Sequence, residues 1–266
     1  MTQPRSSGEA KPVRNAKSGQ VLSSVRVSVI IPTLNEAAGL PRTLRSLPDE
    51  VDEVIVADGG STDGTRRLAR AWGAEVVRSP RGRARQLNAG AARASGTVLY
   101  FLHADTLAPP RLGRYADACV RTGVPACFRL CFGDHGGNPW LRLFAYLSRY
   151  GTDLFRFGDQ SLLVLATEFR AVGGYREDHA LLEGHDLVRR LRKRRGFRVH
   201  PERVVTSARR YHRHGVLFTQ AVFVLIVVLY YLGAGQRSLG RLYRYAFSGT
   251  KVGTTRRPSA DHSSNW

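Results

Sequence analysis

Polar side chains follow three of the apolar runs in this 266-residue chain, at the points where the runs end. Asn35 and Glu36 follow the first run, Asp58 ends the second, and His103 and Asp105 follow the fourth. Carboxylates accept hydrogen bonds from base N–H groups and ribose hydroxyls, and together with phosphate they hold Mg²⁺ or Mn²⁺. Imidazole is better tolerated by Mn²⁺. If these residues meet, they can bind a phosphorylated ligand with a divalent cation.

The apolar runs predict the elements that would bring these residues together. Residues 25–31, 52–57, 74–77 and 96–102 are rich in β-branched and other apolar residues and favour buried strands, with helical patterns between them. Alternating strands and helices favour a parallel sheet covered on both faces, in which ligands bind outside the carboxyl ends of the strands. The polar residues above all fall at that edge.

The second half of the chain is less regular. Residues 126–132 and 161–165 favour strands, and residues 141–150 favour a helix. A further helix over 181–194 begins with acidic residues and ends with basic ones, which complements the helix dipole.

Four motifs in order carry a family resemblance, and each stands at an expected strand end or helix start. Residues 28–36 read SVIIPTLNE, 56–65 VADGGSTDGT, 82–90 GRARQLNAG and 102–105 LHAD. The series resembles that of the family 2 glycosyltransferases over residues 25–105, and more weakly to residue 212. Local signatures at 102–106, 158–160 and 206–210 are similar to those of the radical-SAM/selenodomain-associated branch. The resemblance implies a GT-A fold: an α/β protein with a Rossmann-like, mixed and mostly parallel sheet flanked by helices. A C-terminal apolar helix would follow it.

The resemblance also implies a nucleotide-sugar donor, with uracil or guanine as its base. Asp58 would face the base, although a turn or helix N-cap is the plain alternative for this residue. Gly59 stands where many members carry a second Asp. Arg83 would contact phosphate, or simply lie on a solvated basic helix face. The full set implied for donor binding is Pro32, Thr33, Asn35, Glu36, Asp58, Gly59, Arg83 and Asn88.

The metal motif of the family is present in altered form. Asp105 matches the second Asp of the D-x-D motif, and His103 replaces the first. The pair implies Mn²⁺ or Mg²⁺ as the cofactor, neutralising the departing diphosphate. The alternative that His103 is only a polar residue at a strand end, without metal contact, stays open.

The expected catalytic pair is also altered. The family places its general base in a Glu-Asp pair that opens a late helix, and here Glu183 is followed by Gly184. Glu183 is the first candidate for the base of an inverting transfer, and Asp186, one turn on, is the second. Asp159 and Gln160 would line the acceptor side. A weak or inactive transferase is the alternative that Gly184 raises.

Residues 216–232 form a strongly apolar run between basic flanks. The run reaches the lower limit for a membrane span, but Thr219 and Gln220 lie within it, and an interfacial helix or a core helix are alternatives. We expect a cytoplasmic protein, for which peripheral contact with the inner face of the cytoplasmic membrane is one alternative. The acceptor is unknown, and an amphiphile is one candidate. Four regions follow from these patterns: a disordered basic lead-in (1–24), a glycosyltransferase domain (25–212, divided into 25–107 and 108–212), a helical tail (213–247) and a disordered tail (248–266).

Composition leaves other classes to consider. The chain carries 41 Lys and Arg against 21 Asp and Glu, a net charge of +20, which would suit nucleic acid, an anionic membrane or a phosphorylated substrate. The basic residues are spread along the chain without interleaved aromatics, so a nucleic-acid partner is not expected. A nucleotidyltransferase would open with a Gly-rich activation loop, which is not found. Three cysteines favour packed thiols in a reducing compartment.

Overall fold

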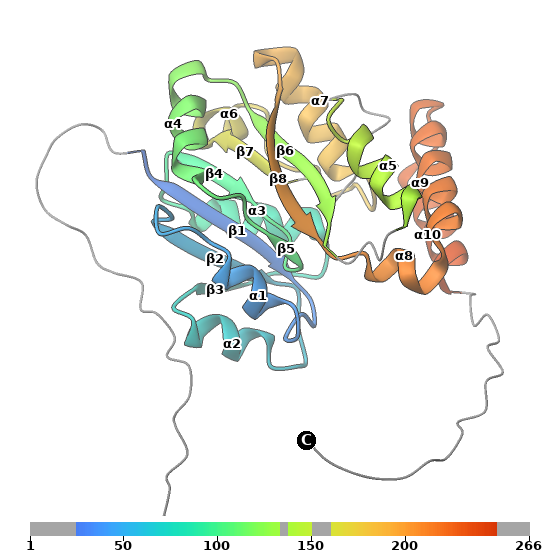
Figure 1. The fold of residues 1–266 in the computed structure, drawn as a ribbon, viewed down its shortest axis with the longest axis horizontal. Helices are drawn as coiled ribbons and strands as arrows, with labels where there is room; N and C mark the ends of the chain where they lie inside the picture. Colours follow the sequence, from blue (N-terminus) through green and yellow to red (C-terminus); the bar gives the residue numbers. More distant parts are fainter. Residues whose placement is uncertain (1–24, 134–137, 151–160, 249–266) are drawn as a thin grey trace, which may run out of the picture.

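The computed structural model describes residues 25–133, 138–150 and 161–248, which form one eight-stranded sheet flanked by helices (Figure 1). The strands are β1 (Val27–Thr33), β2 (Glu53–Asp58), β3 (Glu75–Arg78), β4 (Val98–Phe101), β5 (Thr106–Leu107), β6 (Ala126–Phe132), β7 (Leu162–Leu165) and β8 (Arg198–Thr206). The helices are α1 (Leu40–Arg45), α2 (Thr65–Ala71), α3 (Arg83–Arg93), α4 (Leu112–Thr122), α5 (Pro139–Leu147), α6 (Ala166–Ala171), α7 (Glu183–Arg195), α8 (Arg209–His214), α9 (Val216–Tyr231) and α10 (Gln236–Ser248).

The sheet is mixed, in the order β3-β2-β1-β4-β7-β6-β8-β5. The four strands expected from the first half of the sequence form its parallel part, with β1 between β2 and β4. Strand β7 runs antiparallel to β4 and β6, whereas β6 and β8 are parallel. Strands β5 and β8, which the sequence patterns did not predict, pair antiparallel at the edge.

Alternation along the central strands divides the core into two layers. Val29 and Ile31 of β1 and Tyr100 of β4 face the layer that also contains residues of α1, α4 and α5. Ile30 and Phe101 face the opposite layer, with residues of α3, α6 and α7. Successive side chains of a strand point to opposite faces, so strands buried on both faces are apolar throughout. The continuous apolar runs of the sequence have this physical origin.

Helices α8, α9 and α10 lie together at one side of the sheet, in the orange and red part of the chain (Figure 1). Helix α9 packs against α5, α8 and α10. In the part of the chain that is described, no helix combines the length and apolar character needed to cross a membrane. The apolar run at 216–232 therefore forms a helix of 16 residues packed at the surface of the domain.

Candidate active site

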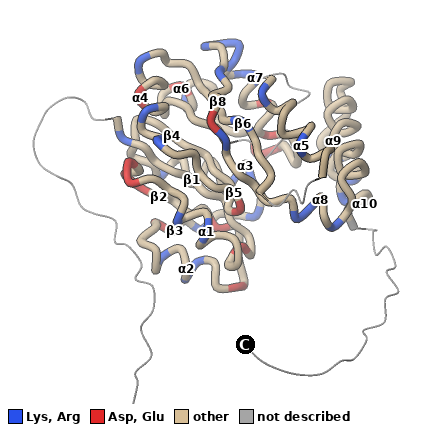
Figure 2. Tube along the Cα trace, in the orientation of Figure 1, with Lys and Arg blue, Asp and Glu red and all other residues tan. Residues whose placement is uncertain are grey.

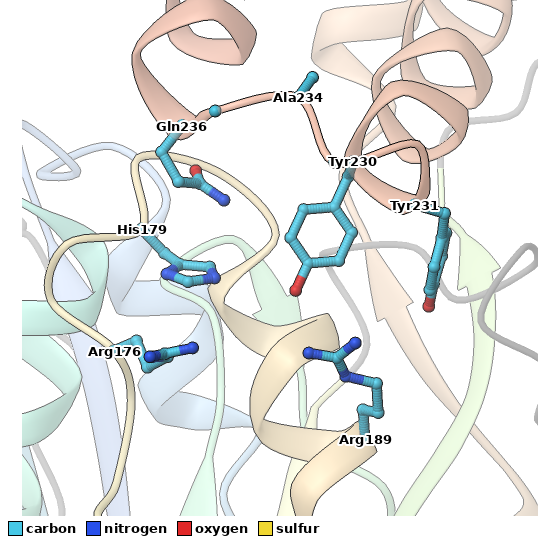
Figure 3. Close-up of a pocket in the computed structure, with 9 residues that line it drawn as sticks. Arg176, His179, Arg189, Tyr230, Tyr231, Ala234 and Gln236 are labelled. Atoms are coloured by element: carbon cyan, nitrogen blue, oxygen red, sulfur yellow. The ribbon is translucent and has the colours of Figure 1, made fainter.

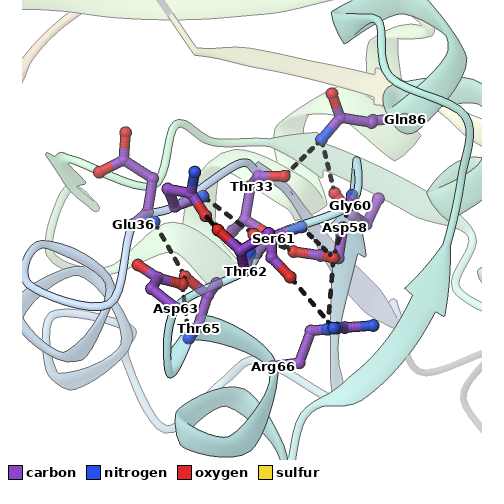
Figure 4. Close-up of polar contacts among 12 residues, drawn as sticks. Thr33, Glu36, Asp58, Gly60, Ser61, Thr62, Asp63, Thr65, Arg66 and Gln86 are labelled. Carbon is purple, nitrogen blue, oxygen red and sulfur yellow. Dashed lines mark hydrogen bonds and ion pairs between the residues drawn. The ribbon is translucent and has the colours of Figure 1, made fainter.

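The loops after β1 and β2 are tied together by side chains from the first two motifs (Figure 4). Asn35 adopts a left-handed backbone conformation (φ 56°), and its side-chain oxygen accepts a hydrogen bond from the Thr62 backbone at 2.8 Å. The Glu36 backbone N–H donates to the Thr65 hydroxyl at 2.9 Å. These contacts hold the Glu36 side chain beside the sheet edge. Asp63 accepts from the Thr65 backbone N–H at 2.9 Å, at the start of α2.

Asp58 is fully buried and serves the turn that follows it. Its Oδ1 accepts from the backbone N–H groups of Gly60 at 3.2 Å and Ser61 at 3.0 Å. Its Oδ2 accepts from the hydroxyls of Thr33, at 3.2 Å, and Ser61. Since a carboxylate has about four acceptor positions, the turn and Thr33 of β1 together use them all. The turn alternative thus describes the present arrangement, and the predicted contact of Asp58 with a base stays a prediction.

Gln86 of α3 explains the glycine that follows Asp58. The Gln86 amide donates to the backbone oxygens of Thr33 at 2.7 Å and Ala57 at 2.9 Å (Figure 4). A Cβ on Gly59 would lie 2.9 Å from this amide, closer than side-chain contacts allow. Gln86 thus fills the space that a second Asp would need. The sequence patterns did not single out Gln86.

Asn88 also has a positional role within the described residues. Its amide nitrogen donates to the Tyr175 carbonyl at 2.8 Å, and its oxygen accepts from the Tyr175 N–H at 2.9 Å. Asn88 thereby fixes the segment that leads to α7. The structure ties this predicted donor residue to the backbone rather than leaving its amide toward the sheet edge.

Arg209 joins the acidic residues of two strand ends. Its Nη2 lies 3.2 Å from Glu36 Oε2 and 3.3 Å from Asp105 Oδ2. Burial raises the pKa of Glu36 above its ordinary value, and the hydrogen bond from Arg209 offsets this only in part. The predicted convergence of the β1 and β4 ends is present, and a guanidinium from the second half of the chain completes it.

Arg83 makes a second bridge, at the start of α3. Its Nε lies 3.1 Å from Glu183 Oε1, and its Nη2 contacts His103 Nε2. A guanidinium has no acceptor, so His103 accepts this contact through an unprotonated Nε2. Arg83 therefore connects the predicted metal residue to the predicted base, which stand in different halves of the sequence.

A family model describes most of this constellation. Residues 28–172 match the model of glycosyl transferase family 2, which spans the first two motif loops, α3 and the end of β4. This chain belongs to glycosyl transferase family 2. The chain is 34% identical over 138 residues to validoxylamine A glucosyltransferase of Streptomyces hygroscopicus subsp. jinggangensis, covering 47% of this chain and 33% of that protein. It is 34% identical over 91 residues to glycosyltransferase AglE of Haloferax volcanii, covering 30% of each. The chain thus spans about a third of the length of these curated relatives.

Solved structures support the same fold for this family 2 chain. The mannosyltransferase PcManGT of Pyrobaculum calidifontis, in complex with GDP-Man and Mn²⁺, has a TM-score of 0.58 at 20% identity, covering 83% of this chain and 69% of that one. Glucosyl-3-phosphoglycerate synthase of Mycobacterium tuberculosis, in complex with phosphoglyceric acid, has a TM-score of 0.53 at 22% identity, covering 78% and 80%. The predicted GT-A fold is confirmed.

The strained backbone at the start of α7 in this family 2 chain is at Leu182 and not at Gly184. Leu182 has a left-handed backbone (φ 61°), which costs a bulky residue about 1 kcal/mol or more. Gly184 lies in the first turn of the helix, and a Cβ added there would meet no atom within 4 Å. The glycine is therefore not required by packing, and nothing in the described contacts explains its presence.

Asp186, the second candidate for the base, is buried inside the protein and paired with its own helix. Its Oδ1 lies 3.3 Å from Arg189 and its Oδ2 2.8 Å from Arg190. Arg190 also donates to the Gly174 carbonyl at 2.7 Å. Only 1% of the Asp186 side chain is exposed, so an acceptor hydroxyl has no path to it in this arrangement. Of the two candidates Glu183 is the more exposed, and a role of Asp186 as the base stays a prediction.

The metal residues lie at the same edge but do not form a closed set. Among residues 25–133, 138–150 and 161–248, no three His, Cys, Asp or Glu side chains are grouped so that they could hold an ion. Asp105 and His103 offer one carboxylate and one imidazole, which fits a cation that takes its remaining ligands from phosphate and water. The predicted acceptor residues Asp159 and Gln160 lie outside the described residues.

Proposed function

We propose that this family 2 chain transfers a sugar from a nucleoside diphosphate donor to a hydroxyl or carboxyl acceptor, with inversion at the sugar carbon. The observation that carries the proposal is the meeting of Arg83 and Arg209 with Glu36, Asp105 and Glu183 at the carboxyl edge of the sheet. A diphosphate gains negative charge as it leaves, and guanidinium groups stabilise that charge by two-pronged hydrogen bonds. The carboxylates hold both guanidiniums at this edge before the donor arrives.

Glu183 is the residue we assign as the general base. Its side chain is 11% exposed and lies at the start of α7, with Arg83 on one oxygen. As the acceptor oxygen forms its bond to the sugar carbon, its proton passes to Glu183, and the bond to the diphosphate breaks with both electrons on the leaving oxygen. The ion pair with Arg83 fixes the position of the Glu183 carboxylate at the start of α7. Because Gly184 stands where the family places the usual base, a slow transferase stays the alternative.

Asp105 and His103 would hold the divalent cation. When bound, the cation would neutralise charge on the diphosphate. Imidazole nitrogen favours Mn²⁺ over Mg²⁺. Arg83 now contacts His103 Nε2, so metal binding through this atom requires Arg83 to turn away from it. Arg209 now occupies one oxygen of Asp105, so donor binding requires this guanidinium to turn from the carboxylate toward the phosphates.

Calorimetry of UDP and GDP, each with Mn²⁺, tests the site. We expect Asp105→Asn and Arg209→Gln to weaken binding by about tenfold or more, because each removes a charge-assisted contact. Asp63→Asn is the control, since Asp63 is an exposed acid of the same edge that caps α2. Unchanged affinity in both site variants, or no binding of either nucleotide, contradicts the proposal. Retained binding without sugar transfer to any acceptor would favour the inactive partner protein.

We also propose that α9 rests on an anionic membrane surface. Its polar Thr219 and Gln220 are buried against the domain, whereas Leu217, Leu225 and Val228 are 43–55% exposed. These exposed residues share one helix face, so the usual distribution of polar and apolar side chains is reversed. The basic residues Arg237, Arg241 and Arg244 of the neighbouring α10 add attraction for anionic lipid.

A further inference from the structure

A pocket of about 330 Å³ lies between α7 and the turn that joins α9 to α10 (Figure 3). Side chains from three separate segments point into it: the loop before α7, α7 itself and the α9–α10 turn. Neither Arg83 nor Arg209 of the candidate active site lines this pocket. The residues that matter for its chemistry are Arg176, His179, Arg189, Tyr230, Tyr231 and Gln236.

No acidic residue lines the pocket, and its cationic side chains are Arg176 and Arg189. Within the described residues Arg176 makes no ion pair or side-chain hydrogen bond, although the nearby Asp178 interacts with it electrostatically. Arg189 is held by Asp186 at 3.3 Å, yet 42% of its side chain stays exposed. Its guanidinium lies 6.0 Å from the centre of the Tyr230 ring, on the pocket side (Figure 3). Two guanidiniums converging on one space favour a phosphate or carboxylate group.

Neutral donors complete the lining. Burial raises the pKa of Tyr230, so its hydroxyl keeps its proton. The Gln236 oxygen accepts from the Leu181 N–H at 3.2 Å, which leaves its amide nitrogen for the pocket. His179 is held by Asp178 through its Nδ1 at 3.1 Å, so its single N–H in the neutral form is already used and His179 shapes the pocket without donating to a ligand. The Tyr230 hydroxyl and the Gln236 amide donate hydrogen bonds to an anion, and the anchor on Gln236 reduces the entropy lost on binding.

The pocket borders the exposed apolar face of α9 through Tyr231. Tyr231 is 46% exposed and lines the pocket, and the next residue, Leu232, is 77% exposed. An anion-binding pocket beside an exposed apolar face matches an amphiphile better than a small polar metabolite.

We propose that this pocket binds the phosphate headgroup of an anionic membrane lipid, whose acyl chains lie along α9. The inference rests on the membrane contact proposed for α9, but not on sugar transfer.

The test uses the full chain with dihexanoyl phosphatidic acid as the probe, below its micelle concentration, so that no bilayer is present. Calorimetry or ligand-observed NMR gives its affinity for the wild type and for Arg176→Gln, Tyr230→Phe and Arg67→Gln. Arg67 is an exposed arginine of α2 that does not line the pocket, so its variant matches the charge change of Arg176→Gln. Glycerol phosphate, which has the headgroup without chains, is the second ligand. Circular dichroism checks that each variant folds.

We expect saturable binding of the lipid, weakened by about tenfold or more in Arg176→Gln and severalfold in Tyr230→Phe, and unchanged in Arg67→Gln. Glycerol phosphate should bind at least about tenfold more weakly than the lipid, because it buries no chains. Equal losses in Arg176→Gln and Arg67→Gln would show diffuse attraction and overturn the pocket. Equal affinity for glycerol phosphate would overturn the lipid assignment. Failure of lipid binding while vesicles still bind would reject the pocket and leave the α9 contact standing.

Discussion

Arg83 connects the two halves of the candidate site. It contacts His103 from the end of β4 and Glu183 from the start of α7. A guanidinium so placed can hold the diphosphate and fix the position of the candidate base. It is therefore a positioning residue for both, and its loss should affect donor binding and turnover together.

We expect Arg83→Gln to raise the KM for the donor and lower kcat/KM by about 10²-fold, because one charged group serves two contacts. Arg85→Gln is the matched control, since Arg85 lies on the same helix and makes only an exposed pair with Glu177 at 3.9 Å. Steady-state kinetics with a nucleotide sugar measures both. Equal effects in the two variants would mean that Arg83 contributes only general positive charge.

A substitution of Glu183 should change the rate of transfer without changing donor binding. Glu183→Gln should lower kcat by about 10²–10⁴-fold, the usual contribution of a general base, with donor affinity nearly unchanged. The expected pattern differs from that of Arg83→Gln, in which KM also changes. Normal turnover in Glu183→Gln would reject the assignment, and loss of donor binding would make Glu183 a structural partner of Arg83.

Gly184 offers a gain-of-function test at the same scale. A side chain at this position enters open space, so Gly184→Asp should fold normally and restore the Glu-Asp pair of the family. We expect kcat to rise by about tenfold or more if the missing carboxylate limits the rate. Gly184→Asn has nearly the same shape without the charge. A rise in both variants, or in neither, would exclude the absent carboxylate as the cause of slow turnover.

Helix α7 carries the candidate base, and its far end is anchored to α6. Glu168 of α6 lies 2.7 Å from Arg194 and 2.8 Å from Arg195, with 7% of its side chain exposed. The hydrogen bond from Arg194, followed by that from Arg195, holds the pKa of Glu168 below its ordinary value of 4.5. A depressed carboxylate pKa stabilises the fold above pH 4.5, and that stability is lost as the pH falls through the folded-state pKa.

Glu168→Gln should therefore lower the free energy of unfolding by about 1–3 kcal/mol at pH 7, and by progressively less below pH 4.5. Urea unfolding at pH 7, 5 and 3.5 measures the difference. Glu75→Gln is the control, since its pair with Arg93 is exposed and should contribute less than about 1 kcal/mol. A cost for Glu168→Gln that does not change with pH would show that packing, not charge, ties α6 to α7.

At the scale of the whole molecule, charge and apolar surface are distributed differently. Lys and Arg occur on many of the helices and strands (Figure 2). Exposed large apolar residues instead concentrate in α5 and α9, which pack together. Scattered positive charge gives weak, salt-dependent attraction to an anionic surface, and only a concentrated apolar face can add a fixed orientation.

Vesicle flotation tests this orientation. The double variant Leu225→Gln/Val228→Gln should reduce binding to phosphatidylglycerol vesicles by about tenfold, because it removes apolar area from the contact. Val120→Gln is the control, since Val120 of α4 is 41% exposed and Val228 is 43% exposed. Raising the salt concentration should weaken binding further. Equal binding by the wild type and the double variant would refute the contact.

The sequence by itself determined the parallel part of the sheet and its edge. Residues that are buried on both faces must be apolar throughout, so β1, β2 and β4 were visible as continuous runs. The carboxyl ends of neighbouring parallel strands share one edge, which made the approach of Glu36 and Asp105 predictable. The family resemblance rested on the same segments, and for the same reason it extended less clearly beyond them.

Only the tertiary structure decided which side chains complete that edge and which merely support it. Arg209 lies 173 positions from Glu36, and no local pattern records such a contact. Asp58 and Asn88 carry the residue types of a binding site, yet the acceptor positions of Asp58 and the amide of Asn88 are taken up by nearby backbone and hydroxyl groups. The sequence of α9 is apolar around most of the helix, apart from Thr219 and Gln220. Which face it buries depends on the neighbours that pack against it, because burial is a property of the assembled chain and not of the segment.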